Sequence, residues 1–174
     1  MKKDGNSLSK KLSLSGILLA LTVITLFVES IAPTNRLSLY ALSSFFIAVV
    51  IIEAGVKAAW SFYFASCILS FIIVQSKIEL IPYAVFFGVY GIIKLYIEKI
   101  NNIVIEYLLK LLFFNLVAIL SFLMLKELIL PGFRLPLPWW IVLLAAEAAF
   151  IVYDYVYSLA IGFYLNRLKK ILKI

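Results

Sequence analysis

Residues 83–115 read YAVFFGVYGIIKLYIEKINNIVIEYLLKLLFFN, and this stretch decides the fold. Two apolar runs lie on either side of the short polar segment EKINN, which covers residues 98–102. A helix that crosses a lipid bilayer needs ~20 mostly apolar residues. Because the first run begins near Leu80 and the second continues to Lys126, the stretch predicts two consecutive membrane-spanning helices with a short loop between them.

The rest of the chain has the same apolar character. Of its 174 residues, 65% are hydrophobic and 14% are charged, and the mean hydropathy is +1.11. A soluble domain is about half apolar and about one quarter charged, and a soluble chain of this length would leave too much apolar surface in water. We therefore expect the lipid bilayer to be the solvent of a single transmembrane domain that takes up residues 1–174.

Six runs are long and apolar enough to be membrane-spanning helices, which predicts an all-α, polytopic integral membrane protein. Glu53 and Lys57 are the only break between the second and the third run. A cleaved signal peptide is the alternative for the first run, but that run is longer than usual and Pro33 follows it directly, so we expect a retained helix. The six predicted helices cover about residues 12–32, 37–52, 58–75, 80–97, 103–126 and 139–164.

Basic residues give the predicted orientation, since loops on the cytoplasmic side of a membrane are enriched in lysine and arginine. With both termini in the cytoplasm, the inner segments hold ten basic residues and the outer loops hold four. The opposite orientation would reverse this bias, so we expect a multi-pass protein of the cell membrane with both termini cytoplasmic. The inner ten are Lys2, Lys3, Lys10, Lys11, Lys57, Lys99, Arg167, Lys169, Lys170 and Lys173, and the outer four are Arg36, Lys77, Lys126 and Arg134.

The residue types present argue against an enzyme and against a metal or cofactor site. The chain has no histidine, which is the commonest general base and metal ligand, and Cys67 is its only cysteine. It has neither a glycine-rich phosphate loop nor a nucleophile-elbow motif. The net charge of +7 comes from residues that cluster at the ends of apolar runs, which indicates membrane orientation and not nucleic-acid binding. Active transport of a solute would need energy from an ion gradient or from another subunit.

Ionisable side chains inside the predicted helices are costly in lipid unless they are paired or hydrated. At ~1.5 Å per residue, Lys94 lies roughly 21 Å from the start of the fourth helix and Asp154 roughly 22 Å from the start of the sixth, so the two are level. Lys110 on the fifth helix reaches the same level, and Glu106 lies one turn away from it. We therefore expect these four residues to form a layer of ion pairs near the inner side. Such a layer is explained by packing, and a substrate or proton site is the alternative.

A second pair of polar residues shares a level in the outer half of the membrane. Glu147 lies roughly 12 Å from the start of the sixth helix, and Asn115 lies roughly 18 Å from the inner end of the fifth. We assign no basic residue to this level, and an unpaired carboxylate there needs water, a proton or a ligand. A proton-coupled transporter that uses Glu147 and Asp154 is one hypothesis for these acids.

An aromatic stripe on the fourth helix raises a similar choice between a pocket and packing. Tyr83, Phe87 and Tyr90 follow one another at spacings of four and three residues and therefore share a face. The opposite face carries the small residues Ala84 and Gly88, which allow another helix to approach closely. The stripe is predicted to be either the wall of a ligand pocket or ordinary aromatic packing.

The first helix divides into a polar face and a small-residue face. One face carries Ser15, Thr22, Thr25 and Glu29, and the nearly opposite face carries Ser13, Gly16 and Ala20. A polar face in a membrane helix should point to protein or to a cavity, whereas small residues allow close approach of a partner helix. The division is consistent with a polar face that points inward and a small-residue face that forms an outward docking surface.

Taken together, these features resemble the substrate-binding S-components of energy-coupling factor (ECF) importers and bacterial membrane proteins related to them. The similarity lies in six short helices with both ends inside, a basic N-terminus that runs into KLSLSGILLALTVI at residues 11–24, and a small-xxx-small motif on the first helix. In that family the motif usually reads Ala-xxx-Ala, and Gly16 and Ala20 would be the matching positions here. The resemblance covers the whole chain in architecture, but the motif is short and no vitamin-specific signature accompanies it.

The resemblance implies a function. An S-component captures a vitamin-like micronutrient from outside and depends on a transmembrane coupling protein and two ATPases for energy, and the small-residue motif docks on the coupling protein. The ligand lies in the outer half, among the fourth to sixth helices and the outer loops. By location alone, the implied ligand-binding residues here are Tyr83, Phe87, Tyr90, Asn115, Trp139, Trp140 and Glu147.

A different class of protein remains open as the main alternative. A non-transporting scaffold of envelope or cell-shape assembly can have a similar six-helix body and would bind membrane or periplasmic proteins. A scaffold should have its outer half filled by side chains, whereas an S-component needs a cavity above Glu147.

Overall fold

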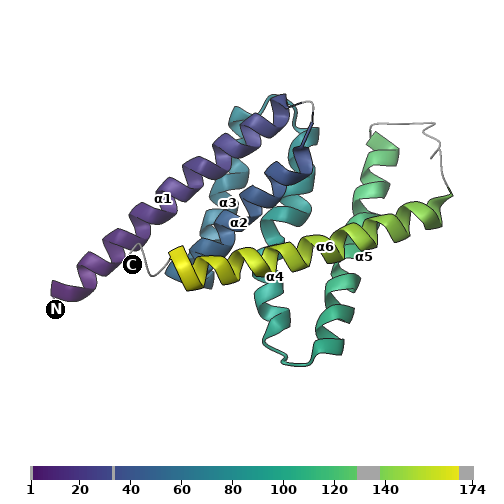
Figure 1. Ribbon diagram of the computed structural model, residues 1–174. Helices are drawn as coiled ribbons and strands as arrows, with labels where there is room; N and C mark the ends of the chain where they lie inside the picture. The colour runs from purple at the N-terminus through teal and green to yellow at the C-terminus, as the bar shows by residue number, and fades with distance from the viewer. Residues whose placement is uncertain (1, 33, 129–137, 169–174) are drawn as a thin grey trace. The chain divides into compact units, whose positions relative to one another are not determined.

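The computed structural model describes the backbone of residues 2–32, 34–128 and 138–168, and the side chains of residues 9–32, 34–123, 138 and 140–167. Every regular element in these ranges is helical (Figure 1). The α-helices are α1 (Lys2–Ile31), α2 (Arg36–Ala54), α3 (Val56–Ile73), α4 (Gly88–Glu98), α5 (Ile103–Leu128) and α6 (Trp139–Phe163). Shorter helical turns are η1 (Ile78–Leu80), η2 (Tyr83–Phe87) and η3 (Tyr164–Leu168).

The described residues contain six helical segments that are long and apolar enough to cross a membrane. They confirm the all-α, multi-pass fold class that the sequence predicts, while the orientation of the termini stays a prediction. The boundaries differ from the predicted ones mostly by a few residues. The larger difference is at the start of α1, which is helical from Lys2 and not only from Leu12.

The break between α2 and α3 is made by a glycine and not by the charged residues on either side of it. Gly55 has φ of +89°, a conformation that residues with a side chain rarely adopt. Its N–H donates to the carbonyl oxygens of Val50 and Ile51 at 3.2 and 3.1 Å, which closes the end of α2. The predicted break at Glu53 and Lys57 is therefore at the right place in the chain, but its cause is Gly55.

The fourth membrane span is not one continuous α-helix. It consists of η1, the widened π-helical turn η2 and α4, and Pro82 lies just before the widened turn. Proline has no N–H to donate, so it weakens the regular hydrogen-bond pattern of a helix where it occurs. Tyr63 of α3 donates its hydroxyl to the carbonyl of Ala84 in this turn at 2.6 Å.

Gly88 lets α3 come close to this span, as the small-residue face of the sequence indicates. A Cβ atom at Gly88 would lie 2.9 Å from Cε2 and 3.0 Å from Cδ2 of the Tyr63 ring. Such distances are shorter than van der Waals contact, so only glycine allows the tyrosine to reach Ala84 in this position.

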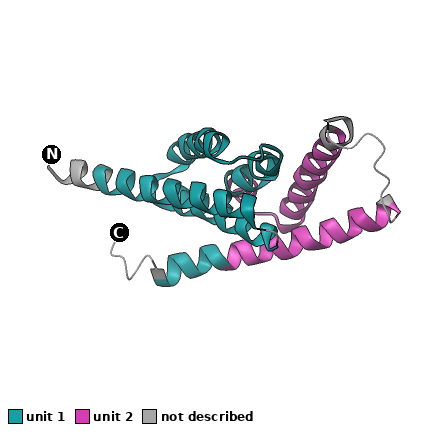
Figure 2. Cartoon of the chain, turned by 90° about the horizontal axis from the view of Figure 1, so that it is seen from above, with its two compact units in different colours: residues 1–93, 160–174 teal, residues 94–159 magenta. Residues whose placement is uncertain are grey.

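The chain divides into two compact units, which Figure 2 shows in different colours. Unit 1 comprises residues 1–93 and 160–174, and unit 2 comprises residues 94–159. In unit 1, the helices α1, α2 and α3 pack against one another, and η2 packs against α2. Leu26, Ile47 and Ala59, one from each of the three helices, are completely buried.

Large apolar side chains outside these contacts are exposed, as expected for helices whose solvent is lipid. Ile72 of α3 and Val104 of α5 are more than two thirds exposed, and α5 is the span with the smallest buried share. In water, such surfaces would make the protein aggregate. Their exposure along the helices therefore fits a protein in contact with a lipid bilayer.

Candidate functional site

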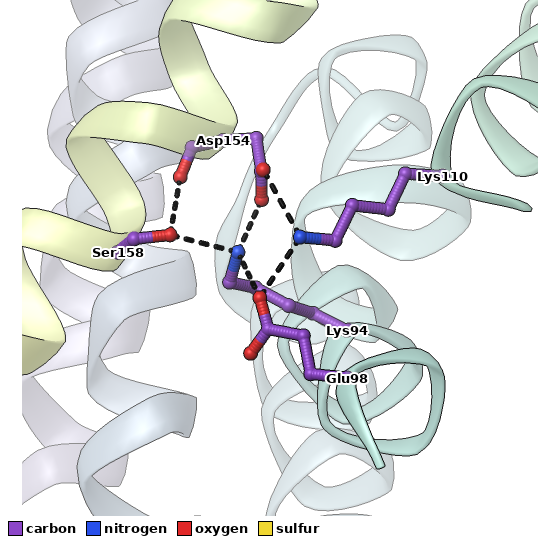
Figure 3. Close-up of polar contacts among 5 residues, drawn as sticks. All are labelled: Lys94, Glu98, Lys110, Asp154 and Ser158. Carbon is purple, nitrogen blue, oxygen red and sulfur yellow. Dashed lines mark hydrogen bonds and ion pairs between the residues drawn. The ribbon is translucent and has the colours of Figure 1, made fainter. Parts of the chain in front are cut away.

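Four charged residues of unit 2 form a closed ring of ion pairs (Figure 3). Lys94 of α4 contacts one oxygen of Asp154 on α6 and lies 2.7 Å from Oε1 of Glu98. Lys110 of α5 contacts the same two acids, at 3.1 Å from Asp154 Oδ2 and 2.8 Å from Glu98 Oε1. Each ammonium group thus touches two carboxylates, and each carboxylate touches two ammonium groups.

The ring is electrically balanced and most of it is buried. Lys94, Lys110 and Asp154 are each no more than 5% exposed, whereas the side chain of Glu98 is 41% exposed. The third hydrogen of the Lys94 ammonium goes to the Ser158 hydroxyl at 2.9 Å, so all three of its donors are used. Two positive and two negative charges cancel, which is the condition under which ionised groups persist in lipid.

The predicted ion-pair layer and the observed ring share three of their four members. Lys94, Lys110 and Asp154 come together at the level that counting residues along the helices gives. The fourth member is Glu98 and not Glu106, for which the described residues show no ion pair. Glu98 lies one turn after Lys94, so its spacing was a signal for this pair in the sequence.

Asn115 and Glu147 make the second polar contact of unit 2. The Asn115 amide donates one hydrogen to Oε1 of Glu147 and the other to the carbonyl oxygen of Leu111, both at 3.0 Å. Both of its N–H groups are then used. Within the described part of the chain, this amide is the only hydrogen-bond partner of the partly buried Glu147 carboxylate, and no cation there balances its negative charge.

A stacked aromatic pair lies between these two polar contacts. The rings of Phe114 on α5 and Phe150 on α6 are 4.7 Å apart and almost parallel, at 12°. On α5 the contacting residues are, in chain order, Lys110, Phe114 and Asn115. Their partners on α6 are Asp154, Phe150 and Glu147, which follow one another in the reverse chain order. The two helices therefore pass each other in opposite directions, which is the arrangement that consecutive membrane crossings require.

The aromatic stripe of the fourth span is buried in packing contacts. Tyr83 is 1% exposed and its hydroxyl is 2.7 Å from the Ser66 hydroxyl of α3. Phe87 stacks on Tyr40 of α2 with ring centroids 5.2 Å apart. Tyr90, also buried, stacks on Phe86, its neighbour one turn away, at 5.4 Å. A role of Tyr83, Phe87 and Tyr90 in ligand binding remains a prediction.

The resemblance implies that the two tryptophans at the start of α6 line a ligand site. Trp140 is about half exposed, which suits an interfacial side chain. The side chain of Trp139 lies outside the described residues.

The two faces of α1 differ in burial in the way the sequence indicates. Thr22 and Thr25 are buried and donate their hydroxyls to backbone carbonyls of α1 itself, at 2.9 and 2.7 Å. On the other face, Ser13, Gly16 and Ala20 are exposed, and a Cβ atom at Gly16 would meet nothing within 4 Å. The small-residue face is thus an open surface of unit 1.

Comparisons of the chain with family models, with curated proteins and with solved structures found no match. The resemblance to ECF S-components therefore rests on the sequence features alone, and the functional argument depends on the contacts described above.

Proposed function

We propose that the protein is the substrate-binding membrane subunit of an ECF-type importer. In this role it captures a small organic, vitamin-like micronutrient from the outer side of the membrane. A separate transmembrane coupling protein and its ATPase subunits supply the energy, which is consistent with the lack of a phosphate-binding loop in the sequence.

The observation that carries the proposal is the open small-residue face of α1. Ser13, Gly16 and Ala20 are exposed, while Thr22, Thr25 and Glu29 on the opposite face of the same helix are buried. Lipid does not require small residues on such a face, since larger apolar side chains cover a helix in a bilayer equally well. Small residues let a second helix approach closely, so they favour a docking surface for the coupling protein.

The polar pair of unit 2 supports a ligand site that complements this surface. Glu147 has one amide hydrogen bond and an uncompensated negative charge, so it can accept a hydrogen bond from a ligand or contact a cationic group. Asn115 holds the carboxylate in place because both of its own donors are engaged. In the proposed orientation this pair is in the outer half of the membrane, on the side from which the substrate arrives.

The proposal is tested by co-purification and native mass spectrometry. Gly16→Leu fills the open face without a clash in the chain itself, because nothing lies within 4 Å of a Cβ there. We expect this variant to lose the coupling protein while it retains a co-purified small molecule. Ala148→Leu is the matched control, since Ala148 is an exposed small residue of α6. Equal recovery of the coupling protein with both variants, or no ligand after a broad metabolite screen, would contradict the proposal.

The burial of the aromatic stripe favours the second candidate, a non-transporting scaffold of envelope or cell-shape assembly. Tyr83 and Phe87 are occupied by contacts with α3 and α2, as is expected where side chains and not a ligand fill the interior. A scaffold would purify without a small molecule and would bring down a membrane or periplasmic protein of the envelope. The same native mass spectra distinguish this result from an importer subunit.

A further inference from the structure

Glu29, near the end of α1, is a buried acid whose one ion-pair partner within the described residues, Arg36, lies 3.9 Å away. Its side chain is 0% exposed, and neither of its carboxylate oxygens has a hydrogen-bond partner in the described part of the chain. Oε2 of Glu79 is buried without a partner as well. A buried carboxylate that receives no hydrogen bond has lost its hydration, and the attraction of Arg36 at 3.9 Å replaces only part of it. A cation from outside the polypeptide could balance the negative charge of Glu29.

Arg36, the cation next to Glu29, is committed to other partners. The single hydrogen on its Nε goes to the carbonyl oxygen of Ala32 at 3.1 Å, and its Nη1 lies 2.8 Å from Oε1 of Glu79. Nε is 3.9 Å from Glu29 Oε1, which is close enough for attraction but too long for a hydrogen bond. The guanidinium thus pairs with Glu79 and only approaches Glu29.

Other groups that could compensate Glu29 are also engaged. The hydroxyl of Tyr40 lies within hydrogen-bond reach of the Glu29 carboxylate, but its single hydrogen is directed to the backbone carbonyl of Glu79. Lys77, just before η1, directs its ammonium group to the carbonyl oxygens of Phe71 and Val74. The two acids and one guanidinium leave one negative charge in excess.

We propose that Glu29, Glu79 and Arg36 form a site for one monovalent cation, held as a proton or as a sodium ion. One positive charge balances the site, because Glu29 and Glu79 contribute two negative charges and Arg36 one positive charge. The ligand must be small, since Glu29 has no exposed surface through which an organic cation could be contacted. Carboxylate oxygens suit both a proton and a hard alkali ion. The site lies within unit 1 and is independent of the proposed importer role.

The test is the thermal unfolding of the purified full-length protein in detergent. Unfolding midpoints are measured in sodium chloride and in choline chloride at equal ionic strength, and then at acidic and alkaline pH without sodium. If the folded state binds the cation, the unfolding midpoint rises with the concentration of that cation. Once the concentration exceeds the dissociation constant of the site, each tenfold increase of sodium or of protons raises the midpoint by roughly 3–5 °C. Glu29→Gln keeps the shape of the side chain but removes its charge, so the dependence should disappear in this variant.

The outcomes separate the two cations from the absence of a site. A sodium-dependent midpoint that Glu29→Gln abolishes assigns a sodium ion, and a pH-dependent midpoint without a sodium effect assigns a proton. Glu106→Gln, at a half-buried acid of α5, is the control and should keep the dependence of the unsubstituted protein. If wild type and Glu29→Gln respond equally to sodium and to pH, the proposal is overturned.

A second variant keeps the test decisive if Glu29→Gln does not fold. Arg36 is 42% exposed, so Arg36→Gln should fold. It removes the only positive charge of the site, so that only cations from the solution can balance the two acids. The shift of the midpoint with sodium or protons should therefore be larger than in wild type, and an unchanged or smaller shift would also overturn the proposal.

Discussion

Replacement of Asp154 by asparagine is the strongest test of the ion-pair ring of unit 2. Asp154 receives hydrogen bonds from both Lys94 and Lys110, and a hydrogen bond to a charged group contributes about 1.5–3 kcal/mol. Asparagine keeps one acceptor oxygen but no charge, so two ammonium groups then share the single carboxylate of Glu98. Loss of one partner of a buried ion pair costs about 3–5 kcal/mol, and we expect Asp154→Asn to lower the free energy of unfolding by about this amount.

A second substitution separates the effect of charge from the effect of packing. Charge balance predicts that it raises the free energy of unfolding of Asp154→Asn, whereas a loss of packing would lower it further. Lys94→Met added to Asp154→Asn removes one positive charge and leaves Lys110 paired with Glu98 at 2.8 Å. The ring is then neutral again, so the double variant should be more stable than Asp154→Asn alone, although it carries more changes. The free energy of unfolding is measured by titration with denaturing detergent in mixed micelles, followed by tryptophan fluorescence.

Two results would refute this reasoning. One is a loss of less than about 1 kcal/mol for Asp154→Asn, which is the range of an exposed ion pair. The other is additivity of the two substitutions, because residues that share an ion-pair network should couple. Glu106→Gln is the control on α5, and it should change the free energy of unfolding by no more than about 0.5 kcal/mol.

Two further predictions concern close packing and the second polar contact. Gly88→Ala should lower the free energy of unfolding by about 1–3 kcal/mol, because its Cβ would overlap the Tyr63 ring. Gly16→Ala, at an open position of the same residue type, should be neutral or slightly stabilising in the same unfolding assay. Asn115→Leu should cost about 1–3 kcal/mol because Glu147 loses its amide donor. Glu147→Gln keeps an acceptor for that donor and should unfold like wild type, so a large loss there would contradict the assigned contact.

The helices of the fold could be predicted from the sequence because a bilayer imposes both length and composition on each crossing. Six apolar runs of sufficient length were enough to identify the six spans. Hydropathy says nothing about backbone geometry inside a span, so the widened turn at Tyr83–Phe87 was missed. The break at Gly55 was located but attributed to neighbouring charges, since only the backbone angle identifies the glycine as its cause.

For the polar contacts, the sequence predicted which residues are level on neighbouring helices better than the direction in which each side chain points. A constant rise per residue put Lys94 level with Asp154, and these residues do touch. The same counting cannot tell how far each helix is rotated about its own axis. That rotation decides that Lys110 points to Glu98 on α4. The contact of Arg36 with Glu79 joins two segments far apart in the chain, and no local pattern predicts it.

The two charged clusters suggest different roles because they differ in charge balance. In the ring of unit 2, two lysines meet two acids, and the three hydrogens of Lys94 all have acceptors. Such a cluster is complete without any ligand, so its expected contribution is to hold α4, α5 and α6 in register. In unit 1, Glu29 is buried without a hydrogen-bond partner in the described part of the chain, although hydration or exposure would have been less costly for a structural acid. An additional positive charge would complete this cluster, which makes Glu29 the better candidate for a functional group.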